Sequence, residues 1–263
     1  MLKLLQLTDW PMPLLKPYGA FHLGVMSVGI TLAVVCAMRA RSLSERSRDS
    51  LLFGVGVFLM LSELYKQLFL TFVVYSGHYS WWHFPFQLCS MPMYLCLLLR
   101  WVGGRTHDVI LEFLATYTLI GALGAFIEPD GMFYRTLSLT LHSFLWHILL
   151  VFIGFLVGLS ALPGRKLRQF AAAVPVYLGL AGLALLLNFV LHDAARGDIN
   201  MFYIGPNASG QIFFSYVYDH LGWQLNAIVY CTVTTLAALL AHVMFSRMPK
   251  KRGAGGQNGQ ISF

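Results

Sequence analysis

The sequence has very little charge for its length. Only 11% of its 263 residues are charged, whereas 57% are apolar. A soluble domain usually carries about 25% charged residues, so this composition excludes an ordinary water-soluble fold. Several runs of about 20 residues contain almost no charge, and a helix of that length crosses the hydrocarbon of a bilayer. We expect an all-α, polytopic membrane protein.

The sequence also lacks the patterns that indicate a disulfide framework or a bound metal. Each of the four cysteines lies inside an apolar run, and none lies in a loop where cysteines pair. Cys89, Cys96 and two histidines carry ligand atoms, but no two of them have the tight spacing of a zinc or copper site. The last apolar run has no lysine, which excludes a retinal pigment with its Schiff base there. We expect no metal and no cofactor.

Seven apolar runs predict seven transmembrane helices. They cover about 20–38, 51–75, 81–101, 108–127, 136–158, 169–191 and 222–246. Most of the 18 Lys and Arg lie after the first, third and fifth runs and in the tail. This distribution predicts an N-terminus outside and a C-terminus inside, and it is a topology signal rather than a sign of nucleic-acid binding. Residues 1–247 then form one transmembrane domain, and 248–263 form a disordered, basic and Gly-rich cytoplasmic tail.

The third run begins with an unusual polar stretch. Pro85 and Pro92 remove backbone donors and favour a kink or a broken first turn. Three polar side chains lie between them: Gln87, Cys89 and Ser90. Polar groups inside hydrocarbon are costly unless they face a partner or a wet cavity, so this cluster indicates a functional site. Cys89 is the best nucleophile candidate, because a histidine partner can lower the pKa of a thiol from its usual value of about 8.5.

Other polar residues fall at a similar predicted depth in the outer half of the membrane. With ~1.5 Å of rise per residue, Cys89 lies about 12 Å below the outer boundary, and His142 and His147 lie about 9 and 16 Å below it. By the same rise, Glu63 and Lys66 lie roughly 13–18 Å deep. The groups expected to converge in one bundle are Glu63, Lys66, Gln87, Cys89, His142, His147 and Asn188.

These groups also allow structural explanations. Glu63 and Lys66 have the i, i+3 spacing of an ion pair on one helix, which can neutralise itself or orient a histidine. His142 and His147 point about 140° apart on a helix, so only one of them is expected to reach Cys89. The other histidine is then held by a backbone or side-chain partner, and the spacing alone does not rank the two.

The connection between the last two runs, 192–221, is long and apolar in its second half. Residues 212–218 are rich in aromatic side chains. Such a segment is expected to lie on the outer interface, either as a lid over the polar cluster or as a packed interfacial helix. Asn200 and Tyr203, in the first half of the connection, are the residues that we expect to take part in this lid.

Several short motifs carry a family resemblance. They are PFQLCS at 85–90, the later run with His142 and His147, GALGA at 121–125 leading to Pro129-Asp130, and NMFYI at 200–204 with Pro206. Together they resemble the YwaF-like integral membrane proteins, in the superfamily that includes the eukaryotic transmembrane protein 164 group. The resemblance implies a seven-helix membrane protein. In the eukaryotic group a cysteine–histidine pair transfers acyl chains between phospholipids, notably to lyso-ether-phospholipids. If this pair is carried over to the present sequence, the resemblance implies that the cysteine is Cys89 and that the histidine is His147, with His142 as second choice.

We therefore expect a membrane-embedded phospholipid acyltransferase or transacylase that moves a fatty acyl chain through a thioester on Cys89. His147 or His142 acts as base and then as acid for the leaving oxygen. Side chains expected to orient the histidine or to donate to the oxyanion are Gln87, Ser90, Glu63 and Asn188.

The expected partners are membrane phospholipids and lysophospholipids, with no nucleic acid and no protein partner indicated. The expected location is a bacterial cytoplasmic (inner) membrane, in which the protein is multi-pass. Two alternatives belong to other classes of function. A non-enzymatic carrier or receptor for a small amphiphile uses the same cavity without covalent chemistry, and a structural subunit of an envelope complex binds no lipid in it.

Overall fold

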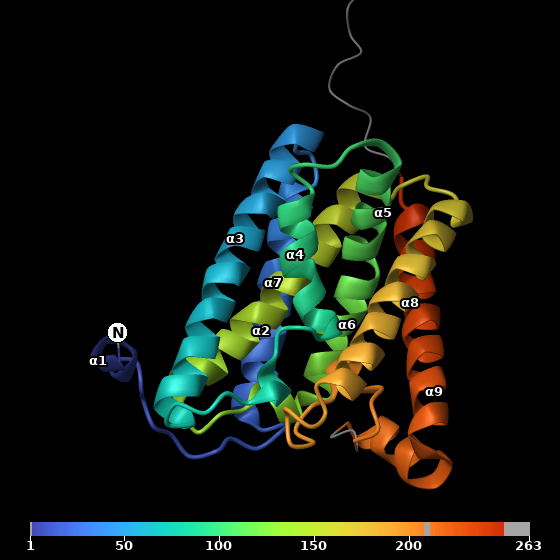
Figure 1. Cartoon of the computed structure of the whole chain (residues 1–263). Helices are drawn as coiled ribbons and strands as arrows, with labels where there is room; N and C mark the ends of the chain where they lie inside the picture. Colours follow the sequence, from blue (N-terminus) through green and yellow to red (C-terminus); the bar gives the residue numbers. More distant parts are fainter. Residues whose placement is uncertain (1, 208–210, 250–263) are drawn as a thin grey trace, which may run out of the picture.

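The computed structural model describes residues 2–207 and 211–249 as a bundle of helices (Figure 1). Within these ranges every regular element is helical, as the all-α prediction requires. Six of the helices are long and apolar enough to cross a membrane. They are α2 (Ala20–Ala40), α3 (Glu45–Phe69) with its π-helical end (Leu70–Val74), α5 (Gly104–Ala115) continued by α6 (Tyr117–Ile127), α7 (Leu137–Ala161), α8 (Leu167–Val190) and α9 (Ile212–Ser246). Residues 250–263 of the predicted tail lie outside the described ranges.

The predicted third span differs most from the structure. Residues 81–101 are expected to form one membrane helix, but the α-helix there is the short α4 (Met91–Leu98), which follows a 3₁₀ turn at Leu88–Ser90. Pro92 fits the first turn of α4, where a missing N–H removes no helical hydrogen bond. The chain before it is irregular or extended, and such backbone is tolerated at membrane depth only where it is covered by protein or lines a cavity.

The last helix begins earlier than predicted. The span expected at 222–246 is the second part of α9, which already starts at Ile212. Gly222, with φ 79° and ψ 167°, breaks the helical conformation inside α9, and a side chain is disfavoured at that φ. The aromatic second half of the predicted connection is therefore a helical segment joined to α9 by a sharp bend.

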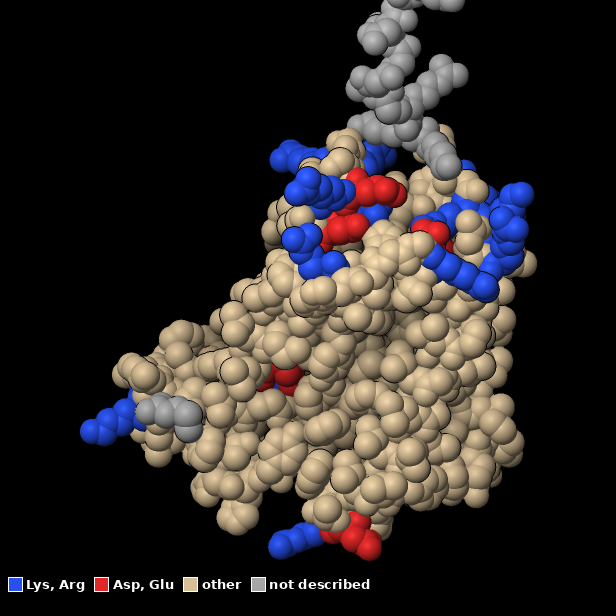
Figure 2. All heavy atoms as spheres, turned by 45° about the horizontal axis from the view of Figure 1, so that its top comes forward, with Lys and Arg blue, Asp and Glu red and all other residues tan. Residues whose placement is uncertain are grey.

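The ends of the bundle differ in charge. In Figure 1 the connections α2–α3, α4–α5 and α7–α8 and the end of α9 all lie at the top. Figure 2 shows that Lys and Arg gather at this end, whereas the sides of the molecule are almost uncharged. We call it the basic end, and it is formed by residues 39–48, 100–105, 165–168 and 247 with their flanking turns. The opposite end, called here the far end, holds the connections 75–90, 128–136 and 191–207.

α7 packs closely against several of its neighbours because two of its residues are glycines. A Cβ atom at Gly154 would lie 2.8 Å from Cβ of Leu119 on α6, and one at Gly158 would lie 2.5 Å from the ring of Phe245 on α9. Both distances are shorter than van der Waals contact, so these positions have no room for a larger residue. Small residues at helix contacts are the usual means of close packing in membranes.

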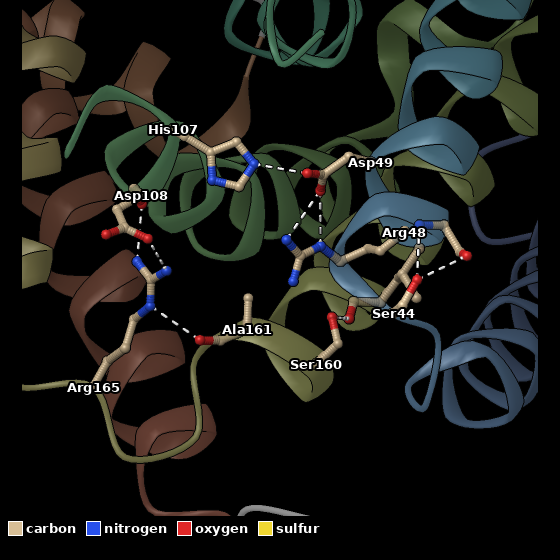
Figure 3. Close-up of polar contacts among 10 residues, drawn as sticks. Ser44, Arg48, Asp49, His107, Asp108, Ser160, Ala161 and Arg165 are labelled. Carbon is tan, nitrogen blue, oxygen red and sulfur yellow. Dashed lines mark hydrogen bonds and ion pairs between the residues drawn. The ribbon is translucent and has the colours of Figure 1, made fainter. Parts of the chain in front are cut away.

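Ion pairs tie the helices together at the basic end (Figure 3). Asp49 of α3 accepts hydrogen bonds from the neighbouring Arg48 at 3.0 Å and pairs with His107 of α5 at 2.9 Å. Arg165, in the connection after α7, reaches Asp108 of α5 at 2.7 Å. These contacts join α3 to α5 and anchor the α7–α8 connection on α5.

One turn deeper, a buried pair joins α5 to α9. Glu112 and His242 are 0% and 2% exposed, and their Oε1 and Nδ1 atoms lie 2.6 Å apart. The guanidinium of Arg165 lies 3.7 Å from the other oxygen of Glu112. We expect Glu112→Ala to lower the free energy of unfolding by about 3–5 kcal/mol, because it leaves His242 and Arg165 without their buried partner.

The matched control is Asp108→Ala, one turn away on the same helix. Asp108 also pairs with Arg165, but its side chain is 56% exposed, so we expect a loss of about 1 kcal/mol or less. Both variants are compared with the unchanged protein by denaturant-induced unfolding in detergent micelles. Equal losses in the two variants would show that the buried pair contributes no more than a surface pair.

Candidate functional site

A cavity of about 670 Å³ lies between the far-end halves of α3, α6, α7 and α9. This volume is in the range of about 300–1,000 Å³ that is typical of ligand sites. Part of its lining is polar, with Glu63, Lys66, Gln87, Cys89, Ser90, His142 and His147. The residues that α6 and α9 contribute are largely apolar, among them Ile120, Gly124, Ala125, Val233 and Ala237. The cavity thus combines a group of polar side chains with an apolar wall.

Cys89 lies in the 3₁₀ turn directly before α4, where its side chain is half-buried and lines the cavity. The turn is fixed from α7, because the indole N–H of Trp146 donates to the carbonyl of Cys89 at 3.0 Å. The partial positive charge at the N-terminus of α4 favours a negative charge at this position. All four cysteines lie in the described part of the chain, and Cys89 is the one that lines the cavity.

The two histidines of α7 both line the cavity, but their hydrogen bonding differs. Nδ1 of His147 lies 2.8 Å from the carbonyl of Ser143 in the preceding turn, so this nitrogen carries the proton and donates. Nε2 of the neutral ring is then left as a proton acceptor. The ring of His142 packs at a tilt of 32° against the indole of Trp146, and within the described residues its buried Nε2 has no hydrogen-bond partner. Cys89 shares the cavity with both rings but, in the described part of the chain, forms no hydrogen bond with either of them.

The predicted ion pair on α3 is confirmed. Lys66 Nζ lies 2.8 Å from Oε1 of Glu63, and this oxygen also accepts a hydrogen bond from Gln67 at 2.7 Å. Gln67 in addition donates to the carbonyl of His83 at 2.5 Å, which ties α3 to the irregular segment before Cys89. The pair lines the cavity, so the ammonium of Lys66 is placed where it can attract an anionic group.

Three of the predicted site residues hold the far-end connection in place. The amide of Gln87 donates to the carbonyl of Asn200 at 2.9 Å and accepts from the N–H of Phe202 at 2.7 Å. Asn188 bonds to both backbone groups of Met201, at 3.0 and 2.6 Å. Gln87 lines the cavity, whereas Asn188 and Asn200 are fully buried and do not. The predicted convergence therefore includes every group except Asn188.

The connection that was expected to form a lid does contact the cavity. Tyr203, Gln211, Phe213 and Phe214 all line it, and the last two belong to the first turn of α9. Phe214 also packs against Tyr230 of α9, with ring centroids 4.8 Å apart. Of the two residues predicted for this role, Tyr203 faces the cavity and Asn200 braces the connection through Gly205 and Asn207, both at 2.8 Å.

Sequence reasoning missed two residues of the site. Trp146 lies within the predicted run 136–158 and was not singled out, although an indole N–H inside a membrane needs an acceptor and therefore signals a contact. Tyr134, in the α6–α7 connection, also lines the cavity. Desolvation, followed by the charge of Glu63, raises the pKa of its phenol, so Tyr134 stays protonated and can donate a hydrogen bond.

Comparison with known proteins agrees with the motifs. No curated protein and no solved structure matches this chain. The model of the TMEM164 family matches residues 17–245, which include all of the helices from α2 to α8 and nearly all of α9. The matched region contains every residue that lines the cavity. The chain is a multi-pass membrane protein of the TMEM164 family.

Proposed function

We propose that the cavity is the site of acyl transfer between membrane phospholipids, through a thioester on Cys89. The observation that carries the proposal is that a half-buried thiol shares one cavity with His147, whose Nε2 is left as an acceptor. A nucleophile with a base whose tautomer is fixed by a further group is the usual arrangement for covalent catalysis. The adjoining apolar wall suits the hydrocarbon of a lipid substrate.

In the first step the thiol proton of Cys89 passes to Nε2 of His147, and the thiolate attacks the ester carbonyl carbon of a phospholipid. The carbon–sulfur bond forms while the carbonyl oxygen becomes an oxyanion. Ser90, the second amide hydrogen of Gln87 and the phenol of Tyr134 are the donors proposed for it. The tetrahedral intermediate then expels the glycerol oxygen, which takes the proton from His147, and a lysophospholipid leaves.

In the second step the hydroxyl of a lysophospholipid gives its proton to His147 and attacks the thioester. The carbon–sulfur bond breaks, the new ester forms, and the proton returns to the sulfur of Cys89. A largely apolar cavity keeps water from competing with the acceptor. Because the base acts on the thiol and on the acceptor in turn, the same histidine serves both halves of the reaction.

The gathering of Lys and Arg at the basic end supports an orientation in which this end faces the cytoplasm. With the basic end in the cytoplasm, the cavity lies in the outer half of the bilayer, and the segment 75–98 supplies the seventh crossing. The proposed membrane is the bacterial cytoplasmic membrane. A reporter enzyme fused after Arg247 tests this orientation, since the proposal requires that it stay inside the cell.

The experiment that tests the function is intact-protein mass spectrometry after incubation with a mixed pool of diacyl phospholipids. We expect a mass increase of one fatty acyl chain, which maps to the peptide with Cys89 and is released by neutral hydroxylamine, as a thioester is. Adding a lysophospholipid should discharge the acyl group and yield a diacyl product. A protein that binds the lipids but never gains an acyl chain would rule out the covalent route.

The second candidate is a non-enzymatic carrier or receptor for a small amphiphile. It is favoured by one observation, that Cys89 is not hydrogen-bonded to either histidine within the described residues. Catalytic hydrogen bonds are often long before substrate binds, so the absence of this bond does not exclude an enzymatic function. If the protein is a carrier, lipid binding should stay tight when the thiol of Cys89 is removed, and no acyl adduct should form. The mass measurement therefore distinguishes the carrier from the acyltransferase.

A further inference from the structure

A second cavity, of about 420 Å³, lies at the basic end, far from the site described above. It is formed where α5 and α8 both begin, and its lining residues are Arg105, Asp108, Val109, Arg168, Gln169 and Ala172. Each helix contributes residues of its first two turns. The positive-inside rule accounts for arginines at this end, but it does not account for two arginines from different helices that line one cavity.

Neither arginine of this cavity has an acidic partner in the described part of the chain. Arg105 and Arg168 are exposed and take part in none of the ion pairs there. The one carboxylate of the lining, Asp108, is held at 2.7 Å by Arg165, as Figure 3 shows. The cavity therefore carries an uncompensated positive charge.

Two further features add to the attraction for an anion. Both arginines lie in the first turn of a helix, where the partial positive charge of the helix end disfavours a cation, and an anion between them removes this conflict. Gln169 accepts from the N–H of Lys166 at 2.5 Å through its carbonyl oxygen, which leaves its amide N–H groups as donors. Two guanidinium groups and an amide form a donor set that suits phosphate oxygens.

We infer that this cavity binds the phosphate group of an anionic ligand, and that the source is the headgroup of an anionic phospholipid in the leaflet at the basic end. Val109 and Ala172 give the cavity an apolar side. Further along α8, exposed apolar side chains such as Val176 and Leu183 provide a surface for acyl chains. Basic pockets between membrane helices on the cytoplasmic side commonly bind such headgroups.

The test is native mass spectrometry of the full-length protein in detergent, titrated with phosphatidylglycerol or phosphatidylcholine. We expect phosphatidylglycerol to bind preferentially, and Arg105→Gln/Arg168→Gln to weaken that binding about 30-fold. The control is Arg39→Gln/Arg41→Gln, which removes the same charge from exposed positions at the same end, outside the cavity. The control should change the affinity less than about twofold.

Two outcomes would overturn the inference. Equal losses of affinity in both double variants would mean that the charge acts diffusely, and equal binding of the two lipids would mean that no anionic group is recognised.

Competition by inorganic phosphate identifies the source of the ligand. If millimolar phosphate displaces phosphatidylglycerol and binds alone with similar affinity, the cavity takes a soluble phosphate; if it does not, the lipid headgroup is the ligand. Unfolding midpoints of the variants establish that both remain folded.

Discussion

Replacing Cys89 by alanine is expected to abolish the fatty-acyl adduct and to lower the rate of acyl transfer by at least about 10³-fold. The thiol is the only protein group of the proposed reaction that forms a bond to the acyl carbon, so without it the proposed intermediate cannot form. Cys89 is half-buried and its backbone carbonyl, rather than its side chain, anchors the indole of Trp146. The substitution should therefore leave the fold and the lipid-binding affinity almost unchanged.

The matched control is Cys231→Ala, on α9. Cys231 is also half-buried, but it does not line the cavity, and we expect this variant to keep both the adduct and the transfer activity. Cys89→Ser provides a further comparison, since it keeps the shape and loses most of the nucleophilicity. If Cys89→Ala still transfers acyl chains at the rate of the unchanged protein, the thioester is not an intermediate, and the carrier becomes the better description.

Much of the fold could be predicted from the sequence because membrane helices have a simple signal. Six of the seven apolar runs correspond to the six long helices, and the basic residues do collect at one end. The prediction that the third run forms a continuous helix was wrong, although Pro85 and Pro92 had indicated a break. Hydropathy shows that a segment can lie inside the membrane, but it does not show that the segment is helical. A segment that is covered by other helices can keep an irregular backbone. Here the side chain of Gln87 bonds to the backbone at 200–202.

The part of the candidate site that depends on depth in the membrane could be predicted from the sequence. Glu63, Lys66, Cys89, His142 and His147 were placed together by their distance from the membrane surface, and all five line one cavity. Depth alone carries no information on which direction a side chain faces. Asn188 lies at the right level, but it faces the backbone of Met201, a contact that depends on how the far-end connection folds.

The buried pair of Glu112 and His242 was missed for a different reason. Each residue stands alone among apolar neighbours, and the two are 130 residues apart in the chain. An ionisable residue inside an apolar run does signal a partner, but the sequence does not name it. Only the packing of α5 against α9 brings the two together.

Exchanging His147 for asparagine is expected to slow acyl transfer by about 10²–10⁴-fold, the usual contribution of a general base. Asparagine keeps an N–H near the position of Nδ1, which can still donate to the carbonyl of Ser143, but it has no atom at the position of Nε2. The variant thus removes the base and keeps the local hydrogen bond. Both formation and discharge of the adduct should slow, because one histidine serves both steps.

His142→Asn is the matched control, since His142 lies on the same helix and lines the same cavity. We expect it to lower the rate less than about tenfold, because Nε2 of His147 remains in place. If the two variants exchange their effects, His142 is the base.

The pH dependence gives an independent test, since a thiol that loses its proton directly to solvent at high pH needs no histidine as base. The deficit of His147→Asn in adduct formation should therefore shrink as the pH is raised, whereas a deficit caused by damaged packing would be the same at every pH.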